Sequence, residues 1–139
     1  MPRPRFPISP RGYGDAKIAC TPRRPGEPAV PQFFRDPGSR IATHVSTLTT
    51  VDMAIDAAIV HVNFYPKGTM MLEHVDHEGG PTIVSISLGD DANFLFGGFN
   101  KTDPYIQIPL YSGDVFIWGG PARMCFRGIS HVFFGTGPH

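Results

Sequence analysis

The chain has 139 residues, enough for one domain with a core, and its two cysteines are too few for a disulfide framework. No apolar run approaches the length of a membrane span, and the N-terminus lacks the apolar stretch of a secretory signal. The chain contains 16 glycines, 15 prolines and 11 phenylalanines. That composition favours short strands, many turns and an aromatic core over a helical bundle.

The formal net charge of zero conceals an asymmetry. Residues 1–40 carry eight Lys or Arg against three Asp or Glu, and residues 41–139 carry four against nine. A basic arm can hold a phosphate backbone, although the charges alone favour a solvated, flexible tail. Nine prolines predict extended or looped backbone for this arm. Within it, residues 11–20 predict a hairpin strand. We divide the chain into an arm of residues 1–40 and a core domain of residues 41–139.

Residues 31–48 are the best helix candidate. Phe33, Ile41, Val45 and Leu48 give partial helical spacing. Pro37 interrupts the pattern, so a broken or late-starting helix is predicted. Residues 49–57 are predicted to form a connector.

Two strand-like runs then flank a turn at residues 66–68. Residues 58–65 alternate, which predicts a strand with Asn63 and Tyr65 on the same face as His61. The second run ends in His74-Val75-Asp76. Residues two apart in an extended chain point the same way, so His74 and Asp76 project together. An imidazole beside a carboxylate forms two-thirds of the facial triad that holds non-haem Fe(II). A surface H-x-D is the alternative.

Short strands are predicted for the remainder of the chain, at residues 82–88, 93–96, 106–110 and 115–118, with a last strand starting near residues 124–126. Closely spaced strands with Gly-rich turns are typical of a sandwich or barrel.

Several motifs together resemble the AlkB-like Fe(II)/2-oxoglutarate-dependent dioxygenases, which remove alkyl groups from nucleic acid bases by oxidation. The matching stretches are, in order, NFYPKG, HVD, PTIVSISLGDDANFLFGG, DPYIQIPLYSGDVFIWGGPAR and FRGISHV. The resemblance implies an all-β double-stranded β-helix, a jelly roll, with an N-terminal arm and one short helix. It also implies Fe(II) as cofactor and 2-oxoglutarate as cosubstrate.

The resemblance further implies roles for individual residues. His74 and Asp76 would bind the metal, and Asn63, Tyr65 and Ser85 would lie at the cosubstrate. The residues facing the nucleic acid would be Tyr13, Glu78 and Lys101. The expected partner is alkylated DNA or RNA, with no membrane association. We expect a monomer in an intracellular compartment, cytoplasmic or nuclear.

The sequence departs from the family pattern at the second metal histidine. The family has a histidine before the glycine of H-G-[VI], and this chain has Arg127 before Gly128. A guanidinium has no lone pair to give to a metal. His131, four residues on, is the candidate replacement, and reaching the metal would require a shift or bulge in the strand.

A second departure lies at the end of the sequence. The family's pattern continues into strands with an arginine for the far carboxylate of 2-oxoglutarate, and no residue here matches it. Three functions stay open at this point. The first is base dealkylation with weak activity. The second is a non-catalytic, nucleic-acid-binding relative or a fragment. The third is a ligand-binding jelly roll without metal.

Overall fold

The computed structural model describes residues 14–19, 32–53, 55, 59–77 and 80–138. The elements in chain order are β1 (Gly14–Ala19), α1 (Gln32–Leu48), β2 (Ile59–Phe64), β3 (Met71–His74), β4 (Thr82–Ile86), β5 (Asp91–Phe96), β6 (Ile106–Leu110), β7 (Val115–Gly119), the 3-10 helix η1 (Gly120–Met124) and β8 (Arg127–Phe133). The prediction of a mostly β chain with one α-helix is confirmed for this part of the sequence.

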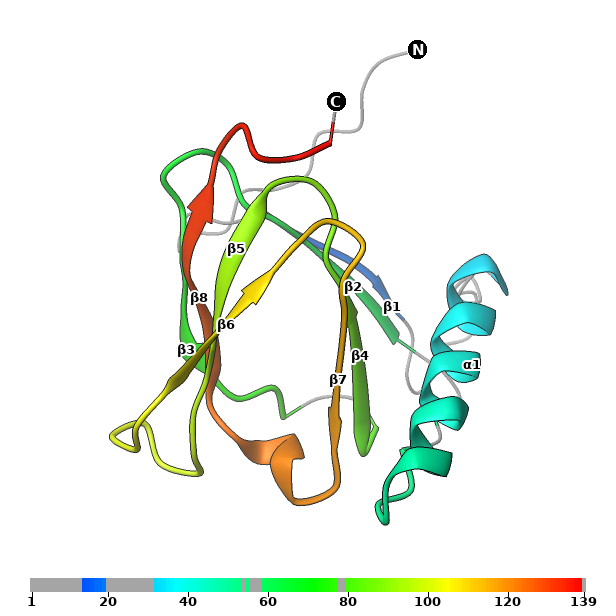
Figure 1. The fold of residues 1–139 in the computed structure, drawn as a ribbon. Helices are drawn as coiled ribbons and strands as arrows, with labels where there is room; N and C mark the ends of the chain where they lie inside the picture. Colours follow the sequence, from blue (N-terminus) through cyan, green and yellow to red (C-terminus); the bar gives the residue numbers. More distant parts are fainter. Residues whose placement is uncertain (1–13, 20–31, 54, 56–58, 78–79, 139) are drawn as a thin grey trace.

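The described strands form three antiparallel groups (Figure 1). The largest is a four-stranded sheet in the order β3-β8-β5-β6, and β4 pairs with β7 and β1 with β2. The four-stranded sheet lies on one side of the molecule and β4–β7 on the other. Helix α1 lies beyond β2 and β4, away from the four-stranded sheet. The arrangement is a sandwich with a helix on one outer face.

Aromatic side chains fill the space between the two layers. Phe94 of β5 lies 5.0 Å from Phe116 of β7, and Phe116 lies 5.4 Å from Trp118, measured between ring centroids. Residues two apart on a strand share a face, so β7 presents both its rings to β5. The buried core around Phe94 consists of Met71, Leu110, Ile129 and Val132. Tilted ring pairs at these separations add to the stabilisation from burial.

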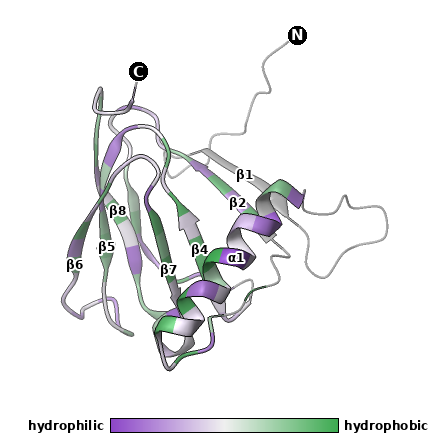
Figure 2. Cartoon of the chain, turned by 45° about the vertical axis from the view of Figure 1, so that its right-hand side comes forward, coloured by the Kyte–Doolittle hydropathy of each residue, from purple (hydrophilic) through white to green (hydrophobic). Residues whose placement is uncertain are grey.

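Helix α1 is continuous, so the predicted break at Pro37 is wrong. Pro37 is the sixth residue of the helix, beyond the four N–H groups that have no helical partner, so it removes one helical hydrogen bond without ending the helix. The buried face is also different from the predicted one. Ala42 is fully buried, whereas Phe33 and Leu48 are about two-thirds exposed, at 67% and 70%. Figure 2 shows hydrophobic and hydrophilic residues interleaved along this helix.

The predicted strands correspond to β2, β4, β5, β6 and β7, with ends that differ by a few residues. The last strand begins later than predicted because η1 takes residues 120–124. The predicted boundary between residues 40 and 41 falls inside α1, and β1 pairs with β2 along its whole length. No helix among the described residues is long and apolar enough to cross a membrane.

Candidate metal centre

The pairing of β3 with β8 sets the position of His74. His74 is the last residue of β3 and its direct partner is Arg127, the first residue of β8. The pairing holds one extra residue on β3 between Met71 and His74. At this irregularity the backbone of β3 passes so close to Gly128 that a Cβ atom there would lie 2.6 Å from the Met71 carbonyl oxygen. The absence of a side chain at Gly128 therefore allows β3 to pair closely with β8.

His74 and Asp76 come together, as their spacing predicts. The Nε2 atom of His74 lies 3.5 Å from Oδ1 of Asp76. The Nδ1 atom lies 2.9 Å from the carbonyl oxygen of Leu72. A carbonyl only accepts, so Nδ1 carries a proton, and loss of the Nε2 proton leaves a lone pair directed at the carboxylate. Holding a metal-binding imidazole by its other nitrogen is a common way of fixing its orientation.

Asp76 is ionised at neutral pH. Hydrogen bonding with His74 is the main cause that holds its pKa well below the usual range. Partial burial opposes this effect, and the charges of Arg127 and His74 add to it. The carboxylate is thus a charged ligand group even without a metal.

Arg127 forms an ion pair with the second carboxylate oxygen. Its Nη2 atom donates to Oδ2 of Asp76, and the residue is only 2% exposed. The guanidinium carbon lies 5.0 Å from the ring centroid of Trp118, within range of a cation–π interaction. Burial lowers the pKa of Arg127 and Asp76 raises it. An arginine stays charged in either case.

Arg123 holds the backbone of the same segment. Its Nη1 atom donates to the carbonyl oxygen of Asp76 at 2.6 Å, and its Nε atom donates to that of Gly80 at 2.9 Å. Sequence reasoning missed this role. The sequence shows only that Arg123 follows a strand and a proline-containing turn. That pattern does not indicate which carbonyl groups the side chain reaches.

The residues fit two of the three protein positions of an Fe(II) site. His74 Nε2 and Asp76 Oδ1 are close enough to share one ion, with metal–ligand distances of about 2.0–2.2 Å. The third ligand is missing, because the cross-strand partner of His74 is Arg127, which cannot coordinate a metal. Among the residues that the structure describes, no group of three His, Cys, Asp or Glu side chains could hold a metal ion.

The structure does not bring His131 to this pair. His131 pairs with Asn93 of β5, whereas Ile129 pairs with the next residue, Phe94, so Ser130 is an extra residue in β8. Such a bulge reverses the alternation of side chains beyond it. Ile129 and Val132 are buried, and His131 is exposed, with its ring 4.6 Å from that of Phe133. The irregularity turns His131 outwards.

The residues predicted for the cosubstrate differ in burial. The Tyr65 hydroxyl lies 3.5 Å from the sulfur of Met71, and the residue packs against the core. Ser85 is half-buried on β4, opposite Phe116. Asn63 is exposed, contrary to the prediction that it shares an inward face with Tyr65. The reason is that β2 turns Val62 inwards and ends at Phe64, so its alternation does not continue to Tyr65.

Of the residues predicted to face nucleic acid, the structure describes one. Lys101 is exposed in the loop between β5 and β6. The loop is held by hydrogen bonds between Asn100 and Asp103, including Asn100 N–H to Asp103 Oδ2 at 2.9 Å. Tyr13 and Glu78 lie outside the described residues.

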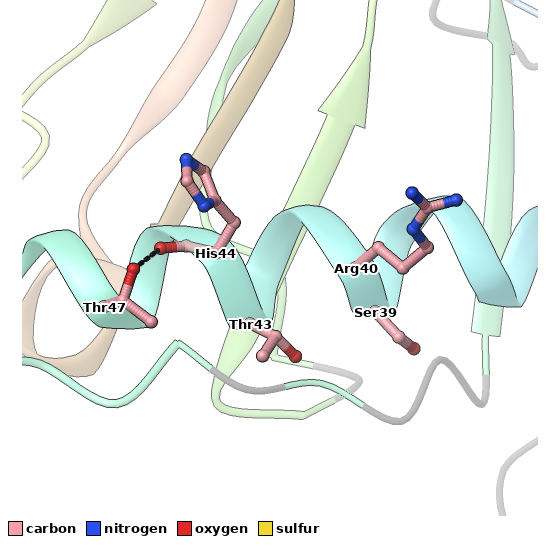
Figure 3. A pocket seen from close by; sticks show the side chains of 5 residues that line it. All are labelled: Ser39, Arg40, Thr43, His44 and Thr47. Carbon is pink, nitrogen blue, oxygen red and sulfur yellow. Dashed lines mark hydrogen bonds between the residues drawn. The ribbon is translucent and has the colours of Figure 1, made fainter.

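An open hollow of about 460 Å³ runs along α1 and is separate from these residues. It is lined by Ser39, Arg40, Thr43, His44 and Thr47. Figure 3 shows that all five come from this one helix and that the Thr47 hydroxyl bonds back to the His44 carbonyl, at 2.7 Å. None of the described residues that line the hollow carries a carboxylate, so this part of the chain does not repeat the pair at His74 and Asp76.

Comparison with known proteins shows which family the chain resembles. The chain matches the 2OG-Fe(II) oxygenase superfamily over residues 19–139. It is 36% identical over 114 residues to the alpha-ketoglutarate-dependent dioxygenase AlkB of Escherichia coli (strain K12), covering 80% of this chain and 50% of that protein. It is 43% identical over 77 residues to the DNA N(6)-methyladenine demethylase ALKBH1A of Arabidopsis thaliana, covering 53% of this chain and 22% of that protein. The chain thus spans half or less of these two relatives.

The fold agrees as well. The solved structure of OsALKBH1 superposes with a TM-score of 0.74 at 25% sequence identity, covering 91% of this chain and 69% of that one. The predicted jelly-roll fold is confirmed by this likeness. With the family match extending over most of its length, the chain belongs to the 2OG-Fe(II) oxygenase superfamily and is AlkB-like within it.

Proposed function

We propose that this chain carries a site for Fe(II)- and 2-oxoglutarate-dependent dealkylation of alkylated nucleic acid bases. The observation that carries the proposal is the convergence of His74 Nε2 and Asp76 Oδ1 to 3.5 Å at the end of β3. The names of the relatives support the substrate class, since they include a DNA N(6)-methyladenine demethylase and, in Schizosaccharomyces pombe, a tRNA demethylase.

His74 and Asp76 would hold the metal, each through one atom. The Leu72 carbonyl keeps the His74 ring oriented, and Arg123 fixes the Asp76 backbone, so neither ligand has to be ordered when the metal arrives. Bound Fe(II) and 2-oxoglutarate would supply the oxidising chemistry. Tyr65 and Ser85, both partly buried, are the proposed contacts of the cosubstrate, in keeping with the polar groups that orient small ligands in largely apolar sites.

The nucleic acid would approach through exposed basic groups. Lys101 is exposed on a loop braced by hydrogen bonds, where a cation can contact a phosphate without desolvation. Tyr13 and Glu78 complete the proposed contacts, and the target base would be flipped out of its stack to reach the metal. We further propose that the chain acts as a monomer in an intracellular compartment.

Succinate release with a methylated oligonucleotide tests this function. The expected result is slow release that requires Fe(II) and disappears in His74→Ala. Because Arg127 occupies the place of a third ligand, Arg127→His should release succinate faster than the unmodified chain. The matched control is His131→Ala, which alters an exposed histidine of the same strand and should leave the rate unchanged.

A second candidate is binding to nucleic acid without turnover. The specific observation in its favour is the ion pair between Arg127 and Asp76, which occupies a carboxylate that a metal needs. Oligonucleotide binding together with no succinate release, in the unmodified chain and in Arg127→His alike, would favour this candidate over the first.

A further inference from the structure

The Asp76 carboxylate is shared between two neighbours. Oδ1 faces His74 Nε2, and Oδ2 accepts from Arg127 Nη2. Arg127 is 2% exposed and stacks over Trp118 with its guanidinium carbon 5.0 Å from the ring centroid. A long, flexible side chain buried to this extent, with one face on an aromatic ring and one edge on a carboxylate, has a fixed place in the fold.

The position of Arg127 in the sheet makes this place rigid. Arg127 lies on β8 between two partner strands, with His74 of β3 on one side and Phe96 of β5 on the other. Its Nη1 atom is buried without a hydrogen-bond partner among the described residues. A buried donor without a partner is costly, so the ion pair with Asp76 must contribute enough to hold the guanidinium inside.

We propose that Arg127 is a built-in cation that takes the metal's place beside Asp76. The proposal rests on the assignment of His74 and Asp76 as the metal ligands of the proposed function, and it does not depend on turnover. Arg127 is the buried charge and needs a negative partner, which Asp76, with its side chain 36% exposed, supplies; the positive group beside the carboxylate is therefore part of the chain itself. The fold of this site therefore needs no metal, and a divalent cation that binds there must do so beside a guanidinium.

Two physical effects make the built-in cation and the metal competitors. The guanidinium takes one of the carboxylate's oxygens, and its charge repels a divalent ion, most strongly where water is excluded. Changes in the surroundings of metal ligands alone weaken binding about 10- to 100-fold. Loss of a ligand and gain of a charge together are expected to weaken Mn(II) binding by at least about 100-fold relative to Arg127→His.

The test is thermal unfolding of the full chain with and without 1 mM Mn(II). For the unmodified chain and for Arg127→Lys, which keeps the charge, we expect Mn(II) to leave Tm unchanged. Arg127→Leu removes the cation, so it should melt lower without metal and regain part of the loss with Mn(II). Arg127→His, which removes the charge and adds a ligand, should gain about 5–10 °C once Mn(II) exceeds its Kd about 100-fold.

Arg123→Leu is the matched control. Arg123 is also buried, at 7% exposure, and it donates to the backbone carbonyls of Asp76 and Gly80. Its loss should lower Tm without any recovery in Mn(II), because Arg127 still holds the Asp76 carboxylate. Adding His74→Ala to Arg127→His should abolish the Mn(II) gain, which locates the ion at this site.

The proposal is overturned if Mn(II) raises the Tm of the unmodified chain as much as that of Arg127→His. It is equally overturned if Arg127→Leu melts like the unmodified chain and ignores Mn(II). Should Arg127→Leu not fold, Mn(II) affinity measured by electron paramagnetic resonance decides between the unmodified chain and Arg127→His. Equal affinities sink the proposal, and a difference of about 100-fold or more supports it. Failure of the proposed function would instead appear as absent succinate release in every variant.

Discussion

Gly128 and Met71 lie in such close contact that strands β8 and β3 touch backbone to backbone. A Cβ atom at Gly128 would lie 2.6 Å from the Met71 carbonyl oxygen and 3.3 Å from the Glu73 nitrogen. Real Cβ atoms do not approach backbone this closely, so any side chain at residue 128 must push β3 away. The displaced strand is the one that ends in His74.

Gly128→Ala is therefore expected to lower the free energy of unfolding by about 1–3 kcal/mol, the usual cost of overpacking. Urea denaturation measures it. Gly38→Ala in α1 is the matched control, because nothing lies within 4 Å of its added Cβ. There the loss of chain entropy in the unfolded state should stabilise the chain by about 0.5–1 kcal/mol. Equal effects of the two substitutions would show that the close contact is not a constraint.

His131 is expected to contribute nothing to metal binding. It is exposed beyond the bulge at Ser130, so His131→Ala should change the free energy of unfolding by less than about 0.5 kcal/mol. In the Arg127→His background, Mn(II) affinity should be the same with or without His131, and should be lost with His74→Ala. A titration followed by calorimetry measures both. A fall in affinity on removal of His131 would mean that the strand changes register when metal binds.

The charge of Asp76 should give the stability a defined pH dependence. Its pKa is lower in the folded chain than in the unfolded one, with His74 as the main cause. The stability this adds is present above the unfolded pKa, about 3.9, and is lost as the pH falls towards the folded value. Asp76→Asn should thus be less stable than the unmodified chain by a constant amount between pH 6 and 8.

Below about pH 4 the difference between Asp76→Asn and the unmodified chain should shrink, because Asp76 of the unfolded chain then takes up a proton while the folded carboxylate stays charged beside Arg127, which favours unfolding. Urea denaturation at a series of pH values provides the measurement. A difference that stays the same down to pH 3 would exclude the ion pair as its source.

The first 13 residues are expected to strengthen nucleic acid binding through charge alone. They carry three arginines, Arg3, Arg5 and Arg11, and no acidic residue. Removing residues 1–13 should lower the slope of log K against log salt by about 2–3, as loss of three phosphate contacts would. Fluorescence anisotropy with a short labelled oligonucleotide measures the slope. The cut stops before β1, since β1 pairs with β2 and its removal would disturb the sheet. An unchanged slope would make the segment a solvated tail.

Most of the strands and the proximity of His74 to Asp76 could be predicted because both follow from local patterns, whereas the jelly roll was implied by the resemblance. Alternation and turn residues located most of the strands, and the two-residue spacing placed His74 beside Asp76. The exposure of His131 could not be predicted in this way, because it depends on one extra residue, Ser130, in the pairing of β8 with β5. A bulge depends on how two strands pair, so the pattern of residues along one strand does not reveal it.

The other misses have the same origin. Asn63 was assigned by alternation along β2, but its exposure depends on where that strand ends and which face meets the core. Pro37 predicts a helix break from local sequence, but α1 continues through it with the loss of one helical hydrogen bond. Arg127 was recognised as unable to bind metal, but its ion pair with Asp76 is a tertiary contact across 51 positions of the chain.

Trp118 is the single tryptophan of the chain, and Arg127 stacks on its ring at 5.0 Å. All indole fluorescence of the protein therefore originates from Trp118, whose ring contacts Arg127 of the candidate centre. The emission of an indole responds to a cation held over its face, so displacement of the guanidinium would shift or quench the signal. Trp118 fluorescence therefore reports whether Arg127 stays paired with Asp76. The measurement needs no label, no substrate and no metal with a spectrum of its own.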